Sequence, residues 1–351
     1  MEPKSALPVI EILTPIWQRL FQKSTIGAEE NFFDLGGSAL LAANLFDEIE
    51  RVFGRRLPPE IICRAPTILA LADLLEKPVL PHFPPLVLLK AGMEEPPIFV
   101  THGVGGNVLD LLPVARRIDS GHAILGMQAR GTSETEQPFE RIEDIAQFFL
   151  DAIQELQPRG PYFLIGYSLG GLVTMEMAQR LTVKGEKVAL LAMLESYPHK
   201  RYLSPKERLR LFIRVVTYHA KTILRLPIRQ AVAYLTNSAV RLSYSSGDKS
   251  GTTQSQPPVG GYYAATRDRL RGAGYLALKR YRPRFYCGKI NFVRAEINQL
   301  FPDNPAAVWG HLAHRFGMDS VPGDHSGIIT THFDRLAFVL SRYLQEAFSR
   351  K

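Results

Sequence analysis

The chain has little cysteine and no long apolar run, and both absences narrow the class of protein. Only two cysteines, Cys63 and Cys287, occur in 351 residues. They lie far apart and match no metal-binding or redox spacing, so we expect both to be buried packing residues and expect no metal site. No run of about 18 apolar residues is present, and the first residues lack the apolar stretch of a signal peptide. We therefore expect a cytoplasmic protein without a membrane-spanning helix.

The positive charge is spread unevenly along the chain. The net charge is +8, but residues 1–78 carry 8 Lys/Arg against 11 Asp/Glu, whereas residues 200–294 carry 20 against 3. A basic protein can bind nucleic acid or a membrane surface. Here an acidic first part and a basic later part favour attraction between the two instead. We expect neither a nucleic-acid nor a membrane partner, and a salt-sensitive steering of the acidic part toward the basic one.

The sequence divides into two units of different character. Apolar residues recur at helical spacing through residues 8–78, which predicts a small helical bundle. Residues 79–97 are rich in proline and predict a linker, within which Leu86–Leu89 is a possible first strand. From residue 98 to residue 351 short apolar runs alternate with helical patterns. This alternation predicts a mostly parallel sheet covered by helices on both faces.

The alternation stops at residues 200–280, which read as helices. Leu209, Phe212, Ile213 and Val216 form an apolar stripe, which we expect to cover the active site. Residues 245–261 are rich in Ser, Gly, Thr, Gln and Pro, and we expect them to be mobile. A helical insertion late in an α/β sheet predicts a lid.

The most informative motif is Gly166-Tyr-Ser-Leu-Gly170. It follows an expected strand, residues 162–165, and precedes an expected helix, residues 172–179. A G-x-S-x-G sequence between a strand and a helix predicts a nucleophile elbow, a sharp turn that exposes the serine hydroxyl. Ser168 is therefore the candidate nucleophile.

A serine nucleophile needs a base, and the base needs an orienting acid. In this kind of sheet the chain order is Ser, then Asp or Glu, then His. His325, in a Gly-Asp-His turn after the last expected strand, is the predicted base. Glu195, at the end of the strand after the nucleophile, is the predicted acid. Glu296, one strand later, remains the alternative.

Two backbone N–H groups should stabilise the oxyanion that forms when the serine attacks. One is expected from Leu169, the residue after the nucleophile. The other should come from the glycine-rich loop 101–106, where we favour Val104, because glycines let the backbone approach closely.

These motifs together carry a family resemblance. His102-Gly-Val-Gly-Gly106, the elbow around Ser168, the strand end at Glu195 and the turn at His325 resemble the type I thioesterase domains that end nonribosomal peptide and polyketide synthases. The resemblance covers about residues 86–349 and implies an α/β-hydrolase domain with a helical lid. It also favours position 195 over position 296 for the acid. Most members of the family have Asp there, and the longer Glu is a departure.

The first unit resembles a peptidyl or acyl carrier domain of four-helix type. Asn31-Phe-Phe-Asp-Leu-Gly-Gly37 looks like its core motif. The resemblance implies a serine that receives 4'-phosphopantetheine from a phosphopantetheinyl transferase, with the phosphate near a helix N-terminus. That position is Ala39 here, which has no hydroxyl. Ser38 is a poor substitute because its hydroxyl starts one residue away, so we expect an engineered or natural loss of loading.

The resemblance predicts a terminal thioesterase fed by upstream synthase domains. It would form an acyl-Ser168 intermediate and release an acyl or peptidyl chain by hydrolysis or cyclisation. A free-standing serine esterase or lipase, and a docking module with an unloaded carrier, remain alternatives. The sequence names neither the acyl chain, the mode of release nor the oligomeric state.

Overall fold

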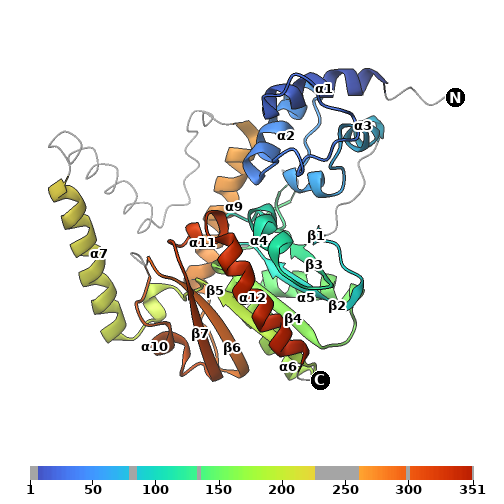
Figure 1. The fold of residues 1–351 in the computed structure, drawn as a ribbon. Coiled ribbons are helices and arrows are strands. Elements are labelled where there is room, and N and C mark those ends of the chain that lie inside the picture. Colours follow the sequence, from blue (N-terminus) through green and yellow to red (C-terminus); the bar gives the residue numbers. More distant parts are fainter. Residues whose placement is uncertain (1–6, 79–84, 133–135, 226–260, 298–300, 350–351) are drawn as a thin grey trace.

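The computed structural model describes residues 7–78, 85–132, 136–225, 261–297 and 301–349. It contains a small helical unit and a larger unit built around one sheet (Figure 1). The helical unit consists of α1 (Leu7–Phe21), α2 (Ala39–Phe53), the 3₁₀ helix η1 (Pro59–Cys63) and α3 (Ile68–Glu76). This agrees with the helical bundle predicted for residues 8–78.

The helical unit has its own core. Trp17 is fully buried, and its ring meets the ring of Phe32 edge-on with centroids 5.5 Å apart. The helices begin where the sequence supplies caps: the side chain of Ser38 accepts a hydrogen bond at the start of α2, and that of Thr67 does so at the start of α3. These oxygens satisfy amide groups that have no partner inside a helix.

Within the described residues, seven strands form one sheet in the order β1-β3-β2-β4-β5-β6-β7. β1 is antiparallel to β3, and the other pairs are parallel. The sheet begins before residue 98, because β1 and the start of β2 lie in the segment expected to be a linker. The strands are β1 (Leu86–Lys90), β2 (Glu94–Thr101), β3 (His122–Met127), β4 (Tyr162–Tyr167), β5 (Val188–Leu194), β6 (Tyr286–Ala295) and β7 (Ala313–Val321).

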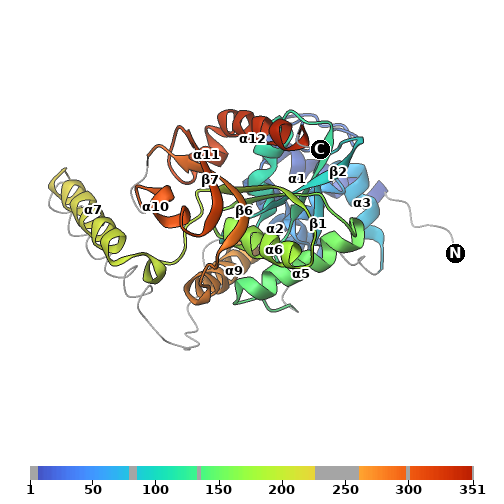
Figure 2. The ribbon, with the colours of Figure 1, turned by 90° about the horizontal axis from the view of Figure 1, so that it is seen from below.

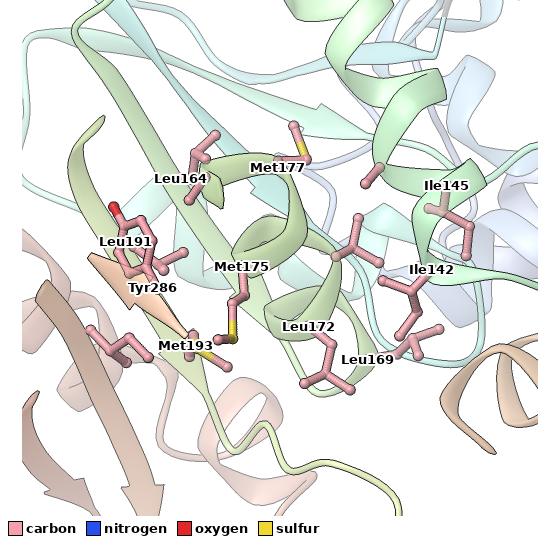
Figure 3. Packing of buried hydrophobic residues seen from close by; sticks show 14 of the residues in the cluster. Ile142, Ile145, Leu164, Leu169, Leu172, Met175, Met177, Leu191, Met193 and Tyr286 are labelled. Atoms are coloured by element: carbon pink, nitrogen blue, oxygen red, sulfur yellow. The ribbon is translucent and has the colours of Figure 1, made fainter. Parts of the chain in front are cut away.

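Helices cover both faces of the sheet, as the alternation predicts. Successive residues of β4 point to opposite faces, so Leu164 joins one apolar cluster and Phe163 and Ile165 join the other. Figure 3 shows the first cluster, where Leu164, Leu191 and Met193 of the sheet meet residues of α5 (Ile142–Leu156) and α6 (Leu169–Val183). The opposite face is covered by the short helices η2 (Val108–Leu111), α4 (Leu112–Arg117) and α11 (Gly327–Thr330), and by α12 (Phe333–Phe348).

The insertion after β5 contains the 3₁₀ helix η3 (Lys200–Tyr202) and the helices α7 (Pro205–Arg225) and α9 (Gly261–Arg280); α10 (Pro305–Trp309) comes later. Residues 226–260 of the predicted lid, with most of the segment expected to be mobile, lie outside the described residues. α7 projects away from the sheet in both views (Figures 1 and 2). Phe212 is 65% exposed and Ile213 is 55% exposed. The expectation that this stripe covers the active site is therefore wrong for the described residues, because α7 points away from the sheet.

The helical unit packs directly on the larger one. Leu109 of η2 is buried in the core cluster of the helical unit. The guanidinium of Arg116 lies 4.3 Å from the ring centre of Phe33. Glu60 is buried at this junction and hydrogen-bonds Thr132, and its burial raises the pKa of the carboxyl to about 7.

None of the described helices is both long and apolar enough to cross a membrane. The expectation that both cysteines are buried packing residues is wrong for Cys287, which is exposed, whereas Cys63 is half-buried.

Glu60 should make stability depend on pH. Its pKa is about 7 in the folded chain against an ordinary 4.5, so the folded state holds a proton that the unfolded state releases between these values. Stability from this site therefore falls as the pH rises through that window. In Glu60→Gln the fall in unfolding free energy between pH 5 and pH 8 should shrink by about 2 kcal/mol. Urea unfolding followed by tryptophan fluorescence measures it.

The matched control is Glu29→Gln, which changes an exposed carboxyl of the same helical unit. It should leave the pH dependence as it is. An equal pH dependence in the Glu60 variant and the unaltered chain would contradict the role of the buried carboxyl.

Candidate active site

Ser168 lies at a sharp turn between β4 and α6. Its backbone has φ 55° and ψ −118°, a conformation that costs free energy for any residue with a side chain. The Ser168 N–H donates to the carbonyl of Leu194 at 2.8 Å, and the Ser196 hydroxyl donates to the Ser168 carbonyl at 2.6 Å. The neighbouring strand end therefore holds the strained residue in place.

Two glycines of the motif allow this turn to form. A Cβ on Gly166 would lie 2.2 Å from the carbonyl oxygen of Gly170. A Cβ on Gly170 would lie 2.4 Å from the carbonyl oxygen of His102. Because the colliding atoms belong to backbone, any side chain at these two positions would push the helix, the strand or the loop at residue 102 out of place.

The structure brings His325 to Ser168. The Nε2 atom of His325 lies 3.1 Å from the Ser168 Oγ, within hydrogen-bond distance. His325 follows β7 in a turn where Gly323 has φ +93° and where Asp324 accepts the Gly327 N–H at 2.7 Å. A side chain at position 323 would also collide with His332, since a Cβ would lie 2.6 Å from its ring.

Glu195 lies beside the Nδ1 atom of His325, whereas Ser168 lies beside Nε2. Glu195 follows β5, is 1% exposed and has φ 46°. Its Oε1 accepts the Ala295 N–H at 2.6 Å, and its Oε2 lies 3.6 Å from the Nδ1 of His325. The second distance suits an ion pair but exceeds that of a hydrogen bond. Within the described part of the chain, the buried Nδ1 has no hydrogen-bond partner.

The alternative acid, Glu296, is placed differently. It is exposed, and its backbone N–H bonds the carbonyl of Val321. In the described ranges its side chain forms no ion pair with a histidine. The geometry brings Glu195, and not Glu296, to His325.

The two N–H groups expected to face the oxyanion are both available. Leu169 is the first residue of α6, where an N–H has no acceptor inside the helix. The Val104 N–H donates to no other residue that the structure describes. Gly274 of α9 lies against both residues, because a Cβ there would be 3.2 Å from the Leu169 Cδ2 and 3.2 Å from the Val104 carbonyl oxygen.

A hollow of about 360 Å³ opens beside these two residues. Its lining is mainly apolar and comes from the loop after β2, the segment after β3, α5 and α9. Its larger apolar side chains are Phe139, Phe148, Ile145, Leu169 and Leu270, and the polar side chains of His102 and Arg130 also line it. The arrangement can accept an apolar group next to a reactive serine.

His102 is close to the site but does not suit a base. It is buried, and burial lowers its pKa to about 4. Its Nδ1 lies 2.7 Å from the carbonyl oxygen of Gly103, so this nitrogen carries the proton of a neutral ring. His102 also precedes Ser168 in the chain, whereas the base of this kind of sheet follows the nucleophile and the acid.

The carrier position offers no attachment atom. Ala39 is the first residue of α2 and carries only a methyl group. The hydroxyl of Ser38 caps the same helix and accepts the Leu41 N–H at 3.2 Å. The residues present therefore do not fit a phosphopantetheine group. Among the described residues there is also no group of three or more metal-ligating side chains.

Sequence reasoning missed the residues that surround the three site side chains. Tyr167 and Phe301 stack against His325, and Ser196 supports Ser168. Trp309 in turn donates its indole N–H to the Ser196 carbonyl at 3.0 Å. The only signal available for Tyr167 was its place inside the elbow motif, and nothing in the sequence pointed to Phe301 or Trp309.

Comparisons with known proteins match both units. The family model described as "Thioesterase domain" matches residues 96–343, and the one described as "Phosphopantetheine attachment site" matches residues 11–75. The dimodular nonribosomal peptide synthase of Bacillus subtilis (strain 168) is 35% identical over 201 residues, which are 57% of this chain and 8% of that protein. The indigoidine synthase of Streptomyces lavendulae is 33% identical over 52% of this chain and 14% of its own length.

Solved structures share the fold. A four-domain nonribosomal peptide synthetase, holo-AB3403, bound to AMP and glycine, aligns with a TM-score of 0.56 and 20% identity over 99% of this chain and 26% of its own. The NocB thioesterase domain, in covalent complex with a fluorophosphonate nocardicin G analogue, aligns with a TM-score of 0.50 and 20% identity over 73% of this chain and 96% of its own. The chain thus spans a small part of the synthases that it resembles.

The elbow glycines provide a test of the site geometry. Gly170→Ala places a methyl group against backbone oxygen, so we expect a loss of stability of about 1–3 kcal/mol and much slower labelling of Ser168 by a fluorophosphonate. Thermal unfolding and intact mass measure the two effects. The control is Gly105→Ala in the neighbouring loop, where a Cβ would meet nothing within 4 Å. Equal behaviour of the two variants would contradict the tight crossing.

Proposed function

Because the chain belongs to the thioesterase domain family, with a phosphopantetheine attachment domain ahead of the catalytic unit, we propose that it releases an acyl or peptidyl chain from a thioester through an acyl-Ser168 intermediate. The observation that carries the proposal is the 3.1 Å approach of the His325 Nε2 to the Ser168 Oγ at a strained elbow. An exposed turn without function would not require this strain.

The first half of the reaction transfers the acyl group to the enzyme. His325 takes the Ser168 proton on Nε2, and the Ser168 Oγ attacks the thioester carbonyl carbon. The N–H groups of Leu169 and Val104 stabilise the negative oxygen of the tetrahedral intermediate. The C–S bond then breaks, the proton on His325 passes to the leaving thiolate, and the acyl group remains as an ester of Ser168.

The second half frees the acyl group. His325 accepts a proton from water or from an amine or hydroxyl of the acyl chain itself, and that oxygen or nitrogen attacks the ester carbonyl. The C–O bond to Ser168 breaks and the Oγ regains its proton. Water gives a free acid, and an internal nucleophile gives a ring. Glu195 acts throughout as the acid that stabilises the imidazolium of His325.

The hollow beside Val104 and Leu169 is the proposed site for the acyl chain. Its aromatic lining from Phe139 and Phe148 suits an apolar acyl terminus, and α9 closes it from the other side. α9 is therefore the part of the lid predicted for residues 200–280 that we propose to cover the acyl chain.

The thioester must arrive on a carrier other than residues 8–78, since Ala39 provides no hydroxyl for loading. We therefore propose upstream synthase domains as partners, in the cytoplasm, and neither nucleic acid nor membrane. The contacts between the helical unit and the larger one favour a docking role for the unloaded carrier. Acidic Asp47 and Glu50 of the carrier and basic Arg267 of α9 line one shared hollow, in keeping with electrostatic attraction between the two units.

Acyl-enzyme mass spectrometry tests the function. Incubation with an acyl thioester should add one acyl group to the unaltered chain and none to Ser168→Ala. Glu195→Gln should lower the rate of acylation by about 10²- to 10⁴-fold, because the imidazolium loses its charged partner. Glu296→Gln, the matched change at the alternative acid, should leave the rate unchanged. A chain that gains no acyl group, or loses activity only in the Glu296 variant, would contradict the assignment.

Restoring a hydroxyl at residue 39 tests whether Ala39 occupies the position of the phosphopantetheine-bearing serine. Ala39→Ser should accept phosphopantetheine from coenzyme A and a phosphopantetheinyl transferase, seen as one added group by intact mass. The unaltered chain, which retains Ser38, should gain none and serves as the control. Loading of the unaltered chain would show that Ser38 is the attachment residue.

A further inference from the structure

Two aromatic rings lie close to the imidazole of His325. The Tyr167 ring stacks on it, with centroids 5.0 Å apart and planes at 28°, and the Phe301 ring lies tilted against it at 4.8 Å and 36°. From this geometry we infer that Tyr167, together with Phe301, is a positioning residue that sets the orientation of the catalytic base. The inference rests on the proposed function and names residues outside the expected triad.

The contact between Glu195 and His325 does not by itself fix the orientation of the imidazole ring. The carboxylate of Glu195 is tied by its Oε1 to the Ala295 N–H, and its Oε2 stays 3.6 Å from the Nδ1 of His325. An ion pair at this distance favours the imidazolium but imposes little direction, because a hydrogen bond is short and prefers a near-linear geometry. The plane of the imidazole must therefore be set by other contacts.

Tyr167 makes two different contacts with the base. Besides the ring stack, its hydroxyl donates to the backbone carbonyl of His325 at 2.8 Å. The side chain thus holds both the turn and the ring of residue 325. Since Tyr167 is buried at the end of β4 and directly precedes Ser168, the nucleophile and the support of its base belong to one rigid segment.

Phe301 is the second ring beside His325, and contacts with two other segments hold it in place. Its ring stacks on that of Tyr197 at 5.1 Å, two residues after Glu195. Its carbonyl accepts a hydrogen bond from Arg214 of α7 at 3.0 Å, and the Arg214 side chain also pairs with Asp303. Phe301 therefore connects the segment that carries Glu195 with α7, the first α-helix of the insertion.

Stacking suits the chemistry of the base. The two nitrogens of an imidazole direct their protons and lone pairs in the ring plane. The two rings thus restrain the plane of the imidazole and leave Nε2 free toward Ser168 and Nδ1 free toward Glu195. Aromatic faces also carry partial negative charge, which attracts the imidazolium formed when the Ser168 proton is transferred.

Three tyrosine variants separate the two contacts. Tyr167→Phe keeps the stack and loses the hydrogen bond, whereas Tyr167→Leu loses both. Tyr162→Phe is the matched control, because the Tyr162 hydroxyl also donates to a backbone carbonyl at 2.8 Å from the same strand. The measurements are kcat and KM for an acyl thioester and the rate at which a fluorophosphonate labels Ser168.

We expect Tyr167→Leu to lower kcat and the labelling rate by about 10- to 100-fold with KM changed less than about threefold, since misplacing a base slows the chemical step. Tyr167→Phe should recover most of this loss, and Tyr162→Phe should match the unaltered chain. A Tyr167→Leu rate within about twofold of the unaltered chain, or an equal loss in Tyr162→Phe, would overturn the inference.

Phe301→Leu keeps the test decisive if Tyr167→Leu fails to fold, because residue 301 lies outside the elbow. It should lower kcat several-fold, and an unchanged kcat would overturn the inference. Failure of the proposed function looks different. In that case the unaltered chain would not turn over thioesters, while fluorophosphonate labelling of Ser168 would still depend on residue 167.

Discussion

The strained backbone of Ser168 is the constraint on which the rest of the site depends. A residue with φ 55° persists only where its surroundings determine its position, and here β4, α6 and the end of β5 do so. Gly166 and Gly170 permit the crossing because a Cβ at either would collide with backbone. The turn presents the hydroxyl to His325 and places Leu169 at the start of α6, where its N–H has no acceptor inside the helix. Residues 166–170 therefore determine both the tight crossing of strand and helix and the position of the nucleophile.

The position of His325 depends more on aromatic contacts than on a hydrogen bond to its acid, Glu195. Glu195 supplies charge at 3.6 Å, while the aromatic rings of Tyr167 and Phe301 restrain the imidazole. A longer acid in place of the family's usual Asp is compatible with this division, because its Oε1 is fixed by the backbone of β6. The contacts of Phe301 extend the same network to α7, which connects the insertion with the base.

The sequence predicted those features that depend on short-range patterns. The alternation of strands and helices, the elbow motif at Ser168 and the turn at His325 follow from apolar periodicity and from glycines at fixed spacing. The resemblance to known domains then selected Glu195 over Glu296, and the geometry agrees. Contacts between distant segments were beyond reach: Phe301 on His325, Leu109 in the carrier core and the outward direction of α7 all depend on packing that no local pattern records. The strand at Leu86–Lys90 was only half recognised, because the surrounding prolines read as a linker.

The most direct test of the account is a crystal structure of the chain after its nucleophile has reacted with an acyl-like fluorophosphonate. We expect the adduct on Ser168, with its phosphoryl oxygen about 2.7–3.1 Å from the N–H groups of both Leu169 and Val104 and the His325 ring still against Tyr167 and Phe301. An adduct on another residue, or a phosphoryl oxygen directed away from these two N–H groups, would contradict the central claim that the elbow builds the catalytic site.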